Sequence, residues 1–491
     1  MKQTAEGKQI SDKQKAAPLW EALEAYKKKG VVPFHTPGHK LRSGPFTRIA
    51  AALGSGFFAL DPSDEIEDPS FDNDFELALE AAESLAAELF GAQDTVFLVN
   101  GTTGGLHYFL MPVTGTVLVP RFSHQAVYSA LILSEGEGIY LPAHFDPDWL
   151  IPLPPKIQQV EKLLAENDCQ AMVLTHPTYY GTVCDLARIT ALAKKRNVRV
   201  FVDEAHGGHF CFSPDLPPTG LECGAHGVVQ STHKTLGSFT QTSMLHSNDK
   251  AWSSKVKQSQ RVLQSTSPSL VFLAVLDEVR RVLALQGGDI TGQTLELAHS
   301  CATRLAQISG VELLPRHLQG DPTKIVFTLR KLGLTGIEVE RILRQDYNIQ
   351  VELSDYYNVL ALITVGDSVD HITKLVNAVG DLAARSTHLG GSGLPRHRVQ
   401  VPGLPPTTHS LREAFFQEQE QIPLAEASGR VSGSFLTPYP PGVPVIVPGE
   451  QFTQDIVEYL SWCSAIGWSI RGLMAEEKVT VLKDYNHFCR K

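Results

Sequence analysis

The chain has 491 residues, of which 43% are hydrophobic and 20% are charged, and its formal net charge is -10 at pH 7. This length exceeds what one hydrophobic core usually supports, so we expect two or three domains. The negative charge argues against nucleic-acid binding and favours a cationic partner or substrate.

The seven cysteines are odd in number, and none has the CxxC spacing of a metal or redox site. This pattern is typical of reduced thiols in a cytoplasmic protein, and it predicts no metal site. The first residues, MKQTAEGKQISDKQKAAPLW, lack the apolar segment of an export signal, and no apolar run is long enough to span a membrane. We therefore expect a cytoplasmic protein that does not bind membranes.

The N-terminal part of the chain combines a helix with an irregular segment. PLWEALEAYKKKG has helical periodicity and ends at Gly30, where a C-cap glycine is expected. VVPFHTPGHK follows, and it is too rich in Pro, Gly and His for regular structure. We treat residues 1–50 as an N-terminal segment. From Asp74, the run DFELALEAAESLAAELFGA predicts an amphipathic helix that ends before Gly91.

Short apolar strands then alternate with helices. The predicted strands are TVFLV, GTVLVP, GIYLP, AMVLTHP, VRVFVDE and GVV, and the helices between them include HQAVYSALILSEG, PKIQQVEKLLAEN and ARITALAKKRN. This alternation predicts a mainly parallel sheet with helices on both faces, which is a three-layer α/β domain. We assign this large domain to residues 51–289.

The rest of the chain predicts two further domains. KIVFTLRKLG, GIEVERILRQDYN, IQVELSD, NVLALITVG and SVDHITKLVNAVGDLAARS are typical of strand, helix, strand, strand and helix. We therefore expect a smaller α+β domain over residues 290–385. Residues 386–410 are rich in Gly, Pro and Ser and predict a linker. Residues 411–491, which contain TPYPPGVPVIVPGE, form the third predicted domain.

Four polar clusters directly follow predicted strands: NGTTGG, RFSHQ, DEAHGGH and STHK. Because ligands of α/β proteins collect at the carboxyl ends of parallel strands, we expect these clusters at one edge of the sheet. NGTTGG could open a helix whose N–H groups, with the hydroxyls of Thr102 and Thr103, bind a phosphate. The alternative is a glycine-rich turn capped by a threonine, and no Walker motif is present.

Three side chains complete a site for one cofactor. Asp203 ends an apolar strand, so its carboxylate should be partly buried and needs a cationic or hydrogen-bonding partner. Lys234 follows the next strand, where desolvation gives an amine the low pKa that Schiff-base chemistry requires. His124 could lie flat against an aromatic ring. Alone, Asp203 also fits a helix N-cap or a structural ion pair, Lys234 a solvated surface lysine and His124 an ordinary hydrogen-bonding histidine. Together with the phosphate cradle, the three residues match pyridoxal 5'-phosphate (PLP).

Seven motifs resemble the Orn/Lys/Arg decarboxylase family: PFHTPGHK, FLVNGTT, HPTYYG, VDEAHGGHF, QSTHKTLGSFTQTSMLH, STSPS and PYPPGVPVIVPGE. The resemblance runs from about residue 18 to 480 and implies the PLP-dependent transferase fold (fold type I) with a C-terminal family-specific domain. The length is similar to that of short bacterial members, often biosynthetic arginine decarboxylases. The family implies decarboxylation of a basic L-amino acid, with arginine to agmatine in polyamine biosynthesis as the best match and lysine or ornithine as alternatives.

The resemblance also implies roles for individual residues. Lys234 would form the Schiff base with PLP, and Asp203 would pair with the ring nitrogen. Other positions would surround the cofactor: His124 on the ring face, Ala205 and His206 beside the ring and the substrate, Thr102, Thr103, Ser231 and His233 at the phosphate, and Thr266 at the phosphate of a neighbouring subunit. Thr266 therefore implies a homodimer with shared active sites, or a higher oligomer.

The distal cationic head of a basic amino acid needs a carboxylate or several carbonyl groups. Glu450, in VPGE, is one candidate, and its alternative role is a helix N-terminal glutamate. The other candidates are the acidic residues of one segment, for which a solvated loop is the alternative: Asp61, Asp64, Glu65, Glu67 and Asp68.

The chain departs from the family pattern around His124. RFSHQA stands where a pattern resembling Arg-Asn-x-His-Lys-Ser is usual. This departure keeps a weakly active PLP-binding regulator open as an alternative function. A different PLP reaction, by an aminotransferase or another amino-acid lyase, is the other alternative, although the motif around Lys234 argues against it.

Overall fold

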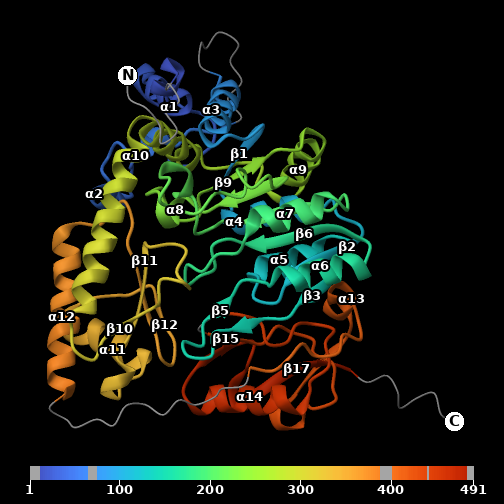
Figure 1. Cartoon of the computed structure of the whole chain (residues 1–491). Coiled ribbons are helices and arrows are strands. Elements are labelled where there is room, and N and C mark those ends of the chain that lie inside the picture. Colours follow the sequence, from blue (N-terminus) through green and yellow to red (C-terminus); the bar gives the residue numbers. More distant parts are fainter. Residues whose placement is uncertain (1–10, 65–73, 388–400, 440–441, 484–491) are drawn as a thin grey trace. The chain divides into compact units, whose positions relative to one another are not determined.

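The structure, a computed structural model, describes residues 11–64, 74–387, 401–439 and 442–483 (Figure 1). The chain divides into two compact units. The first unit comprises the described residues up to Phe109 together with Val202–Gln293. The second unit comprises Leu110–Phe201 together with the described residues from Thr294 onward.

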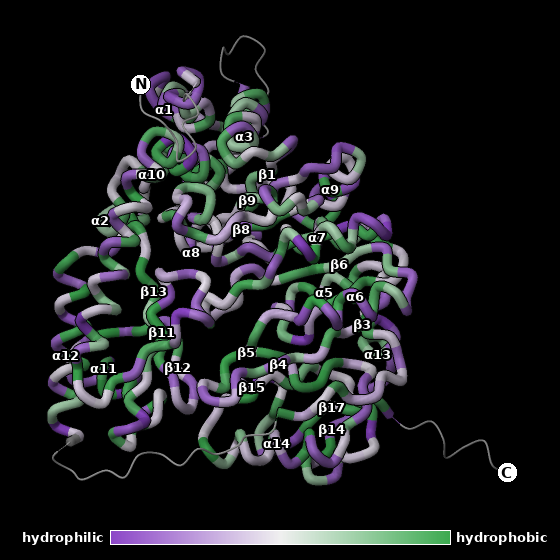
Figure 2. Tube along the Cα trace, viewed as in Figure 1, coloured by the Kyte–Doolittle hydropathy of each residue, from purple (hydrophilic) through white to green (hydrophobic). Residues whose placement is uncertain are grey.

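The largest sheet has seven strands in the order β1-β9-β8-β7-β6-β2-β3. β2 is parallel to β3 and β6, whereas β9 is antiparallel to β1 and β8. The hydrophobic run of β6 is buried and is visible in Figure 2, as expected for a strand covered on both faces. The strands are β1 (Asp94–Leu98), β2 (Thr116–Pro120), β3 (Glu137–Leu141), β6 (Cys169–Thr175), β7 (Arg199–Asp203), β8 (Gly227–Gln230) and β9 (Ser243–Ser247).

Two helices of the first unit begin and end at the predicted signals. α1 (Pro18–Lys29) starts with proline, and Gly30 closes it in the left-handed conformation (φ 63°). α3 (Phe75–Phe90) starts at Asp74, whose side chain accepts a hydrogen bond from the N–H of Glu76. The other helices that begin in this unit are α2 (Thr47–Leu53), α4 (Gly101–Leu110), α8 (Thr232–Thr235), α9 (Lys250–Leu263), α10 (Leu270–Ala306), η1 (Asp12–Lys15), η2 (Phe58–Leu60) and η3 (Phe210–Phe212).

Helix α10 has 37 residues, and the predicted boundary between residues 289 and 290 falls inside it. It carries an ion pair in which Arg280 Nη2 lies 2.5 Å from Asp277 Oδ1, with both side chains 0% exposed. Asp277 also accepts a hydrogen bond from the N–H of Leu19 (2.9 Å), and Arg280 donates one to the carbonyl oxygen of Ala16 (2.6 Å). This pair therefore ties the start of α1 to α10.

The second unit contains helices next to the large sheet and a separate four-stranded sheet. The former are α5 (Gln125–Leu133), α6 (Ile157–Glu166) and α7 (Leu186–Lys194), with a short hairpin of β4 (His144–Phe145) and β5 (Pro152–Leu153). The smaller sheet has the order β10-β11-β13-β12 with antiparallel neighbours, and it packs with helices around one hydrophobic core. This agrees with the predicted α+β pattern. Its elements are β10 (Glu312–Leu313), β11 (Lys324–Thr328), η4 (Arg330–Leu332), α11 (Gly336–Tyr347), β12 (Leu353–Ser354), β13 (Val359–Leu362) and α12 (Val369–Thr387).

The C-terminal part of the second unit, which we call the C-terminal domain, has its own hydrophobic core. Val401 packs against this core, and Thr407 forms a β-bridge with Glu450, so the described end of the predicted linker is joined to this domain. Residues 388–400 lie outside the described residues. The elements are α13 (Leu411–Phe416), β14 (Gln419–Pro423), η5 (Leu424–Glu426), β15 (Thr437–Tyr439), α14 (Gln454–Ala465), β16 (Ser469–Arg471), η6 (Ala475–Glu477) and β17 (Lys478–Leu482).

Candidate active site

β1 and β8 both end beside the first two residues of β9, with Gln230 at the end of β8 opposite Met244. Both strands are antiparallel to β9, and Leu98 at the end of β1 stands opposite Ser243. The hydroxyl oxygen of Thr102 consequently lies 2.7 Å from that of Ser231 and 3.2 Å from that of Ser243. The structure thus brings together Thr102 and Ser231, which are both predicted to lie at the phosphate, and adds Ser243, whose position only the pairing of β9 with both strands reveals.

Thr102 is buried and Thr103 is exposed in the first turn of α4. N–H groups in the first turn of a helix have no partner within the helix, and the helix dipole favours an anion there. The N–H of Gly101 already donates to the carbonyl oxygen of Gln241 (2.8 Å), so the N–H groups of Thr102 and Thr103 are the candidate donors for the predicted phosphate site.

Lys234 lies in α8, directly after β8. Its Nζ atom is 3.1 Å from Nε2 of His206, which is buried in the turn after β7. The lysine is the donor when this ring nitrogen carries no proton. The structure thus brings two of the predicted catalytic residues into direct contact.

Asp203 is the last residue of β7 and is buried. Its Oδ1 atom accepts a hydrogen bond from the N–H of Ala205 (3.2 Å). The N–H of Glu204 donates to the carbonyl oxygen of Val229 (2.9 Å), so the end of β7 is bonded to β8. Asp203 therefore ends one of two strands whose ends are joined, and Lys234 lies in the helix that follows the other.

A buried network that no sequence motif indicates begins at Glu204. Its carboxyl accepts hydrogen bonds from the N–H of Gly220 (2.6 Å) and from Nε2 of Gln230 (2.7 Å). Burial raises the pKa of Glu204 to about 8. Oε1 of Gln230 lies 3.3 Å from Nε2 of His246, whose pKa burial lowers to about 3. Both titratable groups are uncharged at neutral pH, so this network adds no charge next to Asp203.

The predicted phosphate contacts at His233 and Thr266 differ in their surroundings. Nδ1 of His233 lies 2.8 Å from the carbonyl oxygen of Thr242, which can only accept, so Nδ1 carries the proton. Burial lowers the pKa of His233, which favours the neutral ring. Thr266 is exposed between α9 and α10. The roles of both residues stay predictions.

His124, in the second unit, is the N-cap of α5. Its Nδ1 atom accepts a hydrogen bond from the N–H of Ala126 (3.1 Å), and the residue is exposed. His124 therefore makes the ordinary histidine hydrogen bond that is its alternative role, here as a helix cap. This hydrogen bond leaves the exposed ring compatible with the predicted stacking role, which stays a prediction.

Glu450 lies in a buried ion pair within the second unit. Its two carboxylate oxygens lie 2.8 Å from Nη1 and 2.7 Å from Nη2 of Arg121, and its side chain is 1% exposed. The N–H of Val447 donates a further hydrogen bond (2.9 Å). Burial alone would lower the pKa of Arg121, but the nearby carboxylate outweighs burial and raises it. The structure therefore gives Glu450 a partner within the protein, and its contact with a substrate stays a prediction.

Part of the acidic segment can be placed in the first unit. Asp61 Oδ2 lies 3.1 Å from Nε2 of His39, in the PFHTPGHK motif. Asp64 is described and partly buried. The remaining candidates, Glu65, Glu67 and Asp68, lie outside the described residues.

The residues at the strand ends of the first unit fit PLP. The hydroxyls of Thr232 and Thr235, on either side of Lys234, are buried and have no hydrogen-bond partner among the described residues. Such atoms need a polar ligand or water. Thr102 would lie at the phosphate, Asp203 at the ring nitrogen and Lys234 at the aldehyde, so these three groups of the cofactor would each have a partner. Among the described residues, no group of His, Cys, Asp and Glu could hold a metal ion.

This mainly parallel sheet, with a buried aspartate at the end of one strand and a lysine after the next, has the architecture of PLP enzymes of fold type I. Solved structures agree on the fold. Lysine decarboxylase A from Pseudomonas aeruginosa is similar with a TM-score of 0.83 and 21% identity, covering 96% of this chain and 81% of that chain. A Sphingomonas wittichii serine palmitoyltransferase is similar with a TM-score of 0.54 and 15% identity, covering 71% of this chain and 86% of that chain.

Sequence comparison defines the family within this class. The model of the Orn/Lys/Arg decarboxylase major domain matches residues 17–319, and that of the C-terminal domain matches residues 401–480. An arginine decarboxylase from Bacillus anthracis is 36% identical over 489 residues, covering 95% of this chain and 97% of that protein. An arginine decarboxylase from Bacillus subtilis is 34% identical over 464 residues, covering 91% of this chain and 93% of that protein. The chain belongs to the Orn/Lys/Arg decarboxylase family, which confirms the resemblance.

Proposed function

We propose that this protein decarboxylates a basic L-amino acid with PLP and that it prefers L-arginine, which it converts to agmatine and CO2. The observation that carries the proposal is the contact of Lys234 with His206. The two residues follow β8 and β7, whose ends are joined by a hydrogen bond, and β7 ends at the buried Asp203. The preference for arginine is supported by the relatives from Bacillus anthracis and Bacillus subtilis, which are named arginine decarboxylases. Lysine and ornithine rank next.

Each residue has a defined task in this proposal. When bound, PLP supplies an electron sink for the bond that breaks at the substrate α-carbon. Lys234 would hold the aldehyde end of the cofactor, and Asp203 would keep its ring nitrogen protonated. His206, 3.1 Å from the lysine, can orient the amine and exchange a proton with it. His124 would cover the ring face.

CO2 release from arginine, lysine and ornithine, measured with added PLP, tests the reaction and the substrate. We expect arginine to have the highest kcat/KM. Formation of a keto acid in place of CO2 would show an aminotransferase. Bound PLP without turnover of any basic amino acid would support a PLP-binding regulator.

The site is tested by locating the lysine that borohydride reduction links to PLP. We expect the label on Lys234, because this amine follows a strand beside the buried Asp203 and contacts His206. Lys234→Ala should abolish the label, whereas Lys257→Ala, at an exposed lysine that pairs with Asp94, should not. A peptide labelled at another lysine in the wild-type protein would refute the site.

We further propose a homodimer in which a second copy covers residues 32–53. The described structure leaves α2 without a buried residue, and Phe34 is 93% exposed. The segment exposes five large apolar side chains: Val32, Phe34, Phe46, Ile49 and Leu53. Exposed apolar surface of this kind marks protein interaction sites. The dimer would give Thr266 its predicted role at a neighbouring subunit.

We place the protein in the cytoplasm. Six cysteines of the described residues are free thiols, which suits a reducing compartment. Among the helices that the structure describes, none is long and apolar enough to cross a membrane.

A further inference from the structure

The C-terminal domain contacts α5 at both of its ends. Before the helix, Arg121 binds both carboxylate oxygens of Glu450 (2.8 and 2.7 Å). At the other end, Nη1 of Arg412 donates to the carbonyl oxygen of Ile132 in the last turn (2.6 Å). A cation at this position satisfies a carbonyl that has no partner in the helix and complements the helix dipole.

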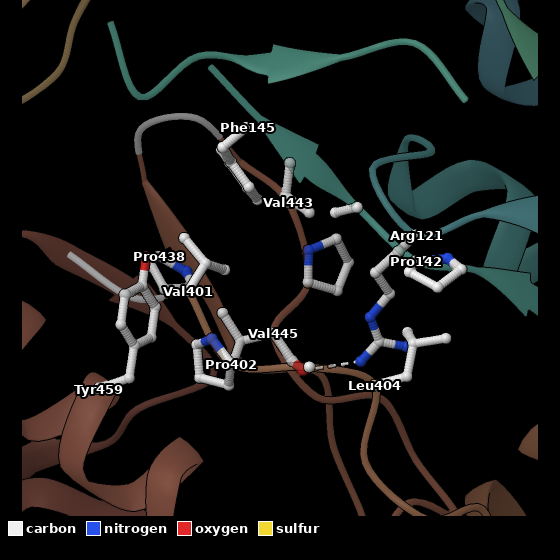
Figure 3. Close-up of a pocket in the computed structure, with 13 residues that line it drawn as sticks. Arg121, Pro142, Phe145, Val401, Pro402, Leu404, Pro438, Val443, Val445 and Tyr459 are labelled. Atoms are coloured by element: carbon white, nitrogen blue, oxygen red, sulfur yellow. Dashed lines mark hydrogen bonds between the residues drawn. The ribbon is translucent and has the colours of Figure 1, made fainter. Parts of the chain in front are cut away.

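The contact before α5 is enclosed. Nη2 of Arg121 also donates to the carbonyl oxygen of Val445 (2.7 Å), as Figure 3 shows. The guanidinium borders a cavity of about 50 Å³ whose other described lining residues are apolar, apart from Tyr459. Charges buried in such surroundings depend on each other, because removal of one leaves the other without compensation.

The backbone holds Glu450 in place for this contact. Gly449 precedes it with φ 89°, and a Cβ atom there would lie 2.3 Å from the carbonyl oxygen of His409. The carbonyl oxygen of Gly449 accepts hydrogen bonds from the N–H groups of Thr408 and His409. The carboxylate therefore projects from a turn that only glycine can form without strain.

The turn that carries Arg121 is bonded to α5. The hydroxyl of Tyr128 donates to the carbonyl oxygen of Arg121 (2.7 Å). The Tyr128 ring packs edge-on against Phe435 of the C-terminal domain, with the two ring centroids 5.9 Å apart. His124 lies between Arg121 and Tyr128 in the sequence and caps the helix through the N–H of Ala126. A shift of Arg121 would therefore change the first turn of α5 and the orientation of the His124 ring.

We propose that the C-terminal domain fixes the position of His124 and that Glu450 and Arg121 are positioning residues for it. The structural part of this inference stands on the contacts above, and its cofactor part rests on the proposed function. It gives the family-specific domain a task at the active site that requires no contact with the substrate.

The structural part is tested by amide hydrogen exchange of the full chain without PLP. In Glu450→Gln, peptides covering residues 121–133 should exchange about tenfold faster or more, because Arg121 loses its charged partner, while peptides of β6 should not change. Glu420→Gln is the matched control, since Glu420 pairs with Arg430 at 2.7 Å in the same domain but at an exposed site. Unchanged protection of α5 in Glu450→Gln would overturn the proposal.

A second variant covers the case in which Glu450→Gln does not fold. Arg121→Lys keeps the positive charge but loses the two-pronged contact with Glu450. Faster exchange over residues 121–133 is expected again, and wild-type exchange in this variant would overturn the proposal. Neither measurement requires the decarboxylation reaction, so failure of the proposed function would not be mistaken for failure here.

The cofactor part is tested by a double-mutant cycle with His124→Ala. Glu450→Gln should alter the circular dichroism of bound PLP and lower kcat more than it raises KM. In the His124→Ala background it should add no further change, because it acts through that ring. Additive effects would overturn the proposal. A raised KM with unchanged circular dichroism would also overturn it and would assign Glu450 to the substrate.

Discussion

At the scale of single residues, the neighbouring carboxyl groups of Asp203 and Glu204 have different surroundings in the candidate site. Asp203 ends β7 with a hydrogen bond to a backbone N–H, whereas Glu204 binds Gly220 and Gln230 in a buried network. Because burial raises the pKa of Glu204 to about 8, this side chain is neutral at pH 7. Asp203 is therefore the residue of the pair that we assign to the cofactor.

Asp203→Asn should keep PLP bound but lower kcat for decarboxylation by about 100-fold or more, because an amide cannot keep the ring nitrogen protonated. PLP absorbance and single-turnover kinetics measure the two effects separately. Asp215→Asn, at an exposed aspartate, is the control and should have wild-type activity. Wild-type turnover in Asp203→Asn would remove this residue from the chemistry.

The buried Glu204 should make the stability of the fold depend on pH. Its pKa is about 8 in the folded chain and near 4.5 when exposed, so between pH 4.5 and pH 8 the folded state binds a proton that the unfolded state has lost. Its contribution is complete below pH 4.5 and is lost as the pH rises through 8, with a slope of at most about 1.4 kcal/mol per pH unit. Glu204→Gln should flatten the fall in the free energy of unfolding between pH 6 and 9. Glu426→Gln, at an exposed site, should leave the fall unchanged; equal slopes in all three proteins would contradict the assignment.

At the scale of elements, α10 organises the N-terminal part of the first unit. The pair of Asp277 and Arg280 binds the backbone of Leu19 and Ala16, so this helix supplies charged partners to chain groups that would otherwise be buried without hydrogen bonds. The attachment of α1 thus depends on two side chains inside a long helix.

Asp277→Ala should lower the free energy of unfolding by about 3 to 5 kcal/mol, because it leaves the guanidinium of Arg280 buried without a counter-charge. Chemical denaturation measures the loss, and hydrogen exchange should locate it first in α1. The neighbouring variant Glu278→Ala is a matched control. It removes a partly exposed pair with Arg281, and such pairs contribute about 1 kcal/mol or less. Similar losses in both variants would show that burial of the pair is not decisive.

At the scale of the whole molecule, the exposed segment of residues 32–53 predicts association. Phe34→Ser should shift the protein towards monomers, because it removes apolar surface that the second copy would cover. Sedimentation equilibrium measures the shift. Phe416→Ser replaces another exposed phenylalanine, 69% exposed in α13, and should not change the mass. A wild-type protein that is monomeric at all concentrations would rule out the dimer.

The sequence predicts well what depends on neighbours along the chain. The bounds of α1 and α3 follow from capping residues. Asp203 and Lys234 are singled out because one ends a strand and the other lies in the short helix after the next strand. Apolar periodicity likewise predicts the sheet that carries them. The strand pattern and the family motifs together therefore predict the fold class and the centre of the site.

What the sequence does not predict depends on distant parts of the chain. Ser243 joins Thr102 only through the pairing of β9 with β1 and β8. Glu450 has no local signal that points to Arg121, since a glutamate after glycine is equally typical of a helix start. The length of α10 is also not predicted, since the predicted domain boundary falls inside this helix of 37 residues.

The ion pair of Arg121 and Glu450 joins residues that are 329 positions apart. At the usual pace of translation, roughly 5 to 20 residues per second, the ribosome needs on the order of 20 to 60 seconds to deliver the partner of Arg121. During that interval the guanidinium cannot be enclosed without cost, because it has no carboxylate to meet. A nascent chain would therefore keep the turn before α5 open until VPGE has emerged. If this contact positions His124 as proposed, the surroundings of His124 would reach their final structure only in chains whose C-terminal domain has been made.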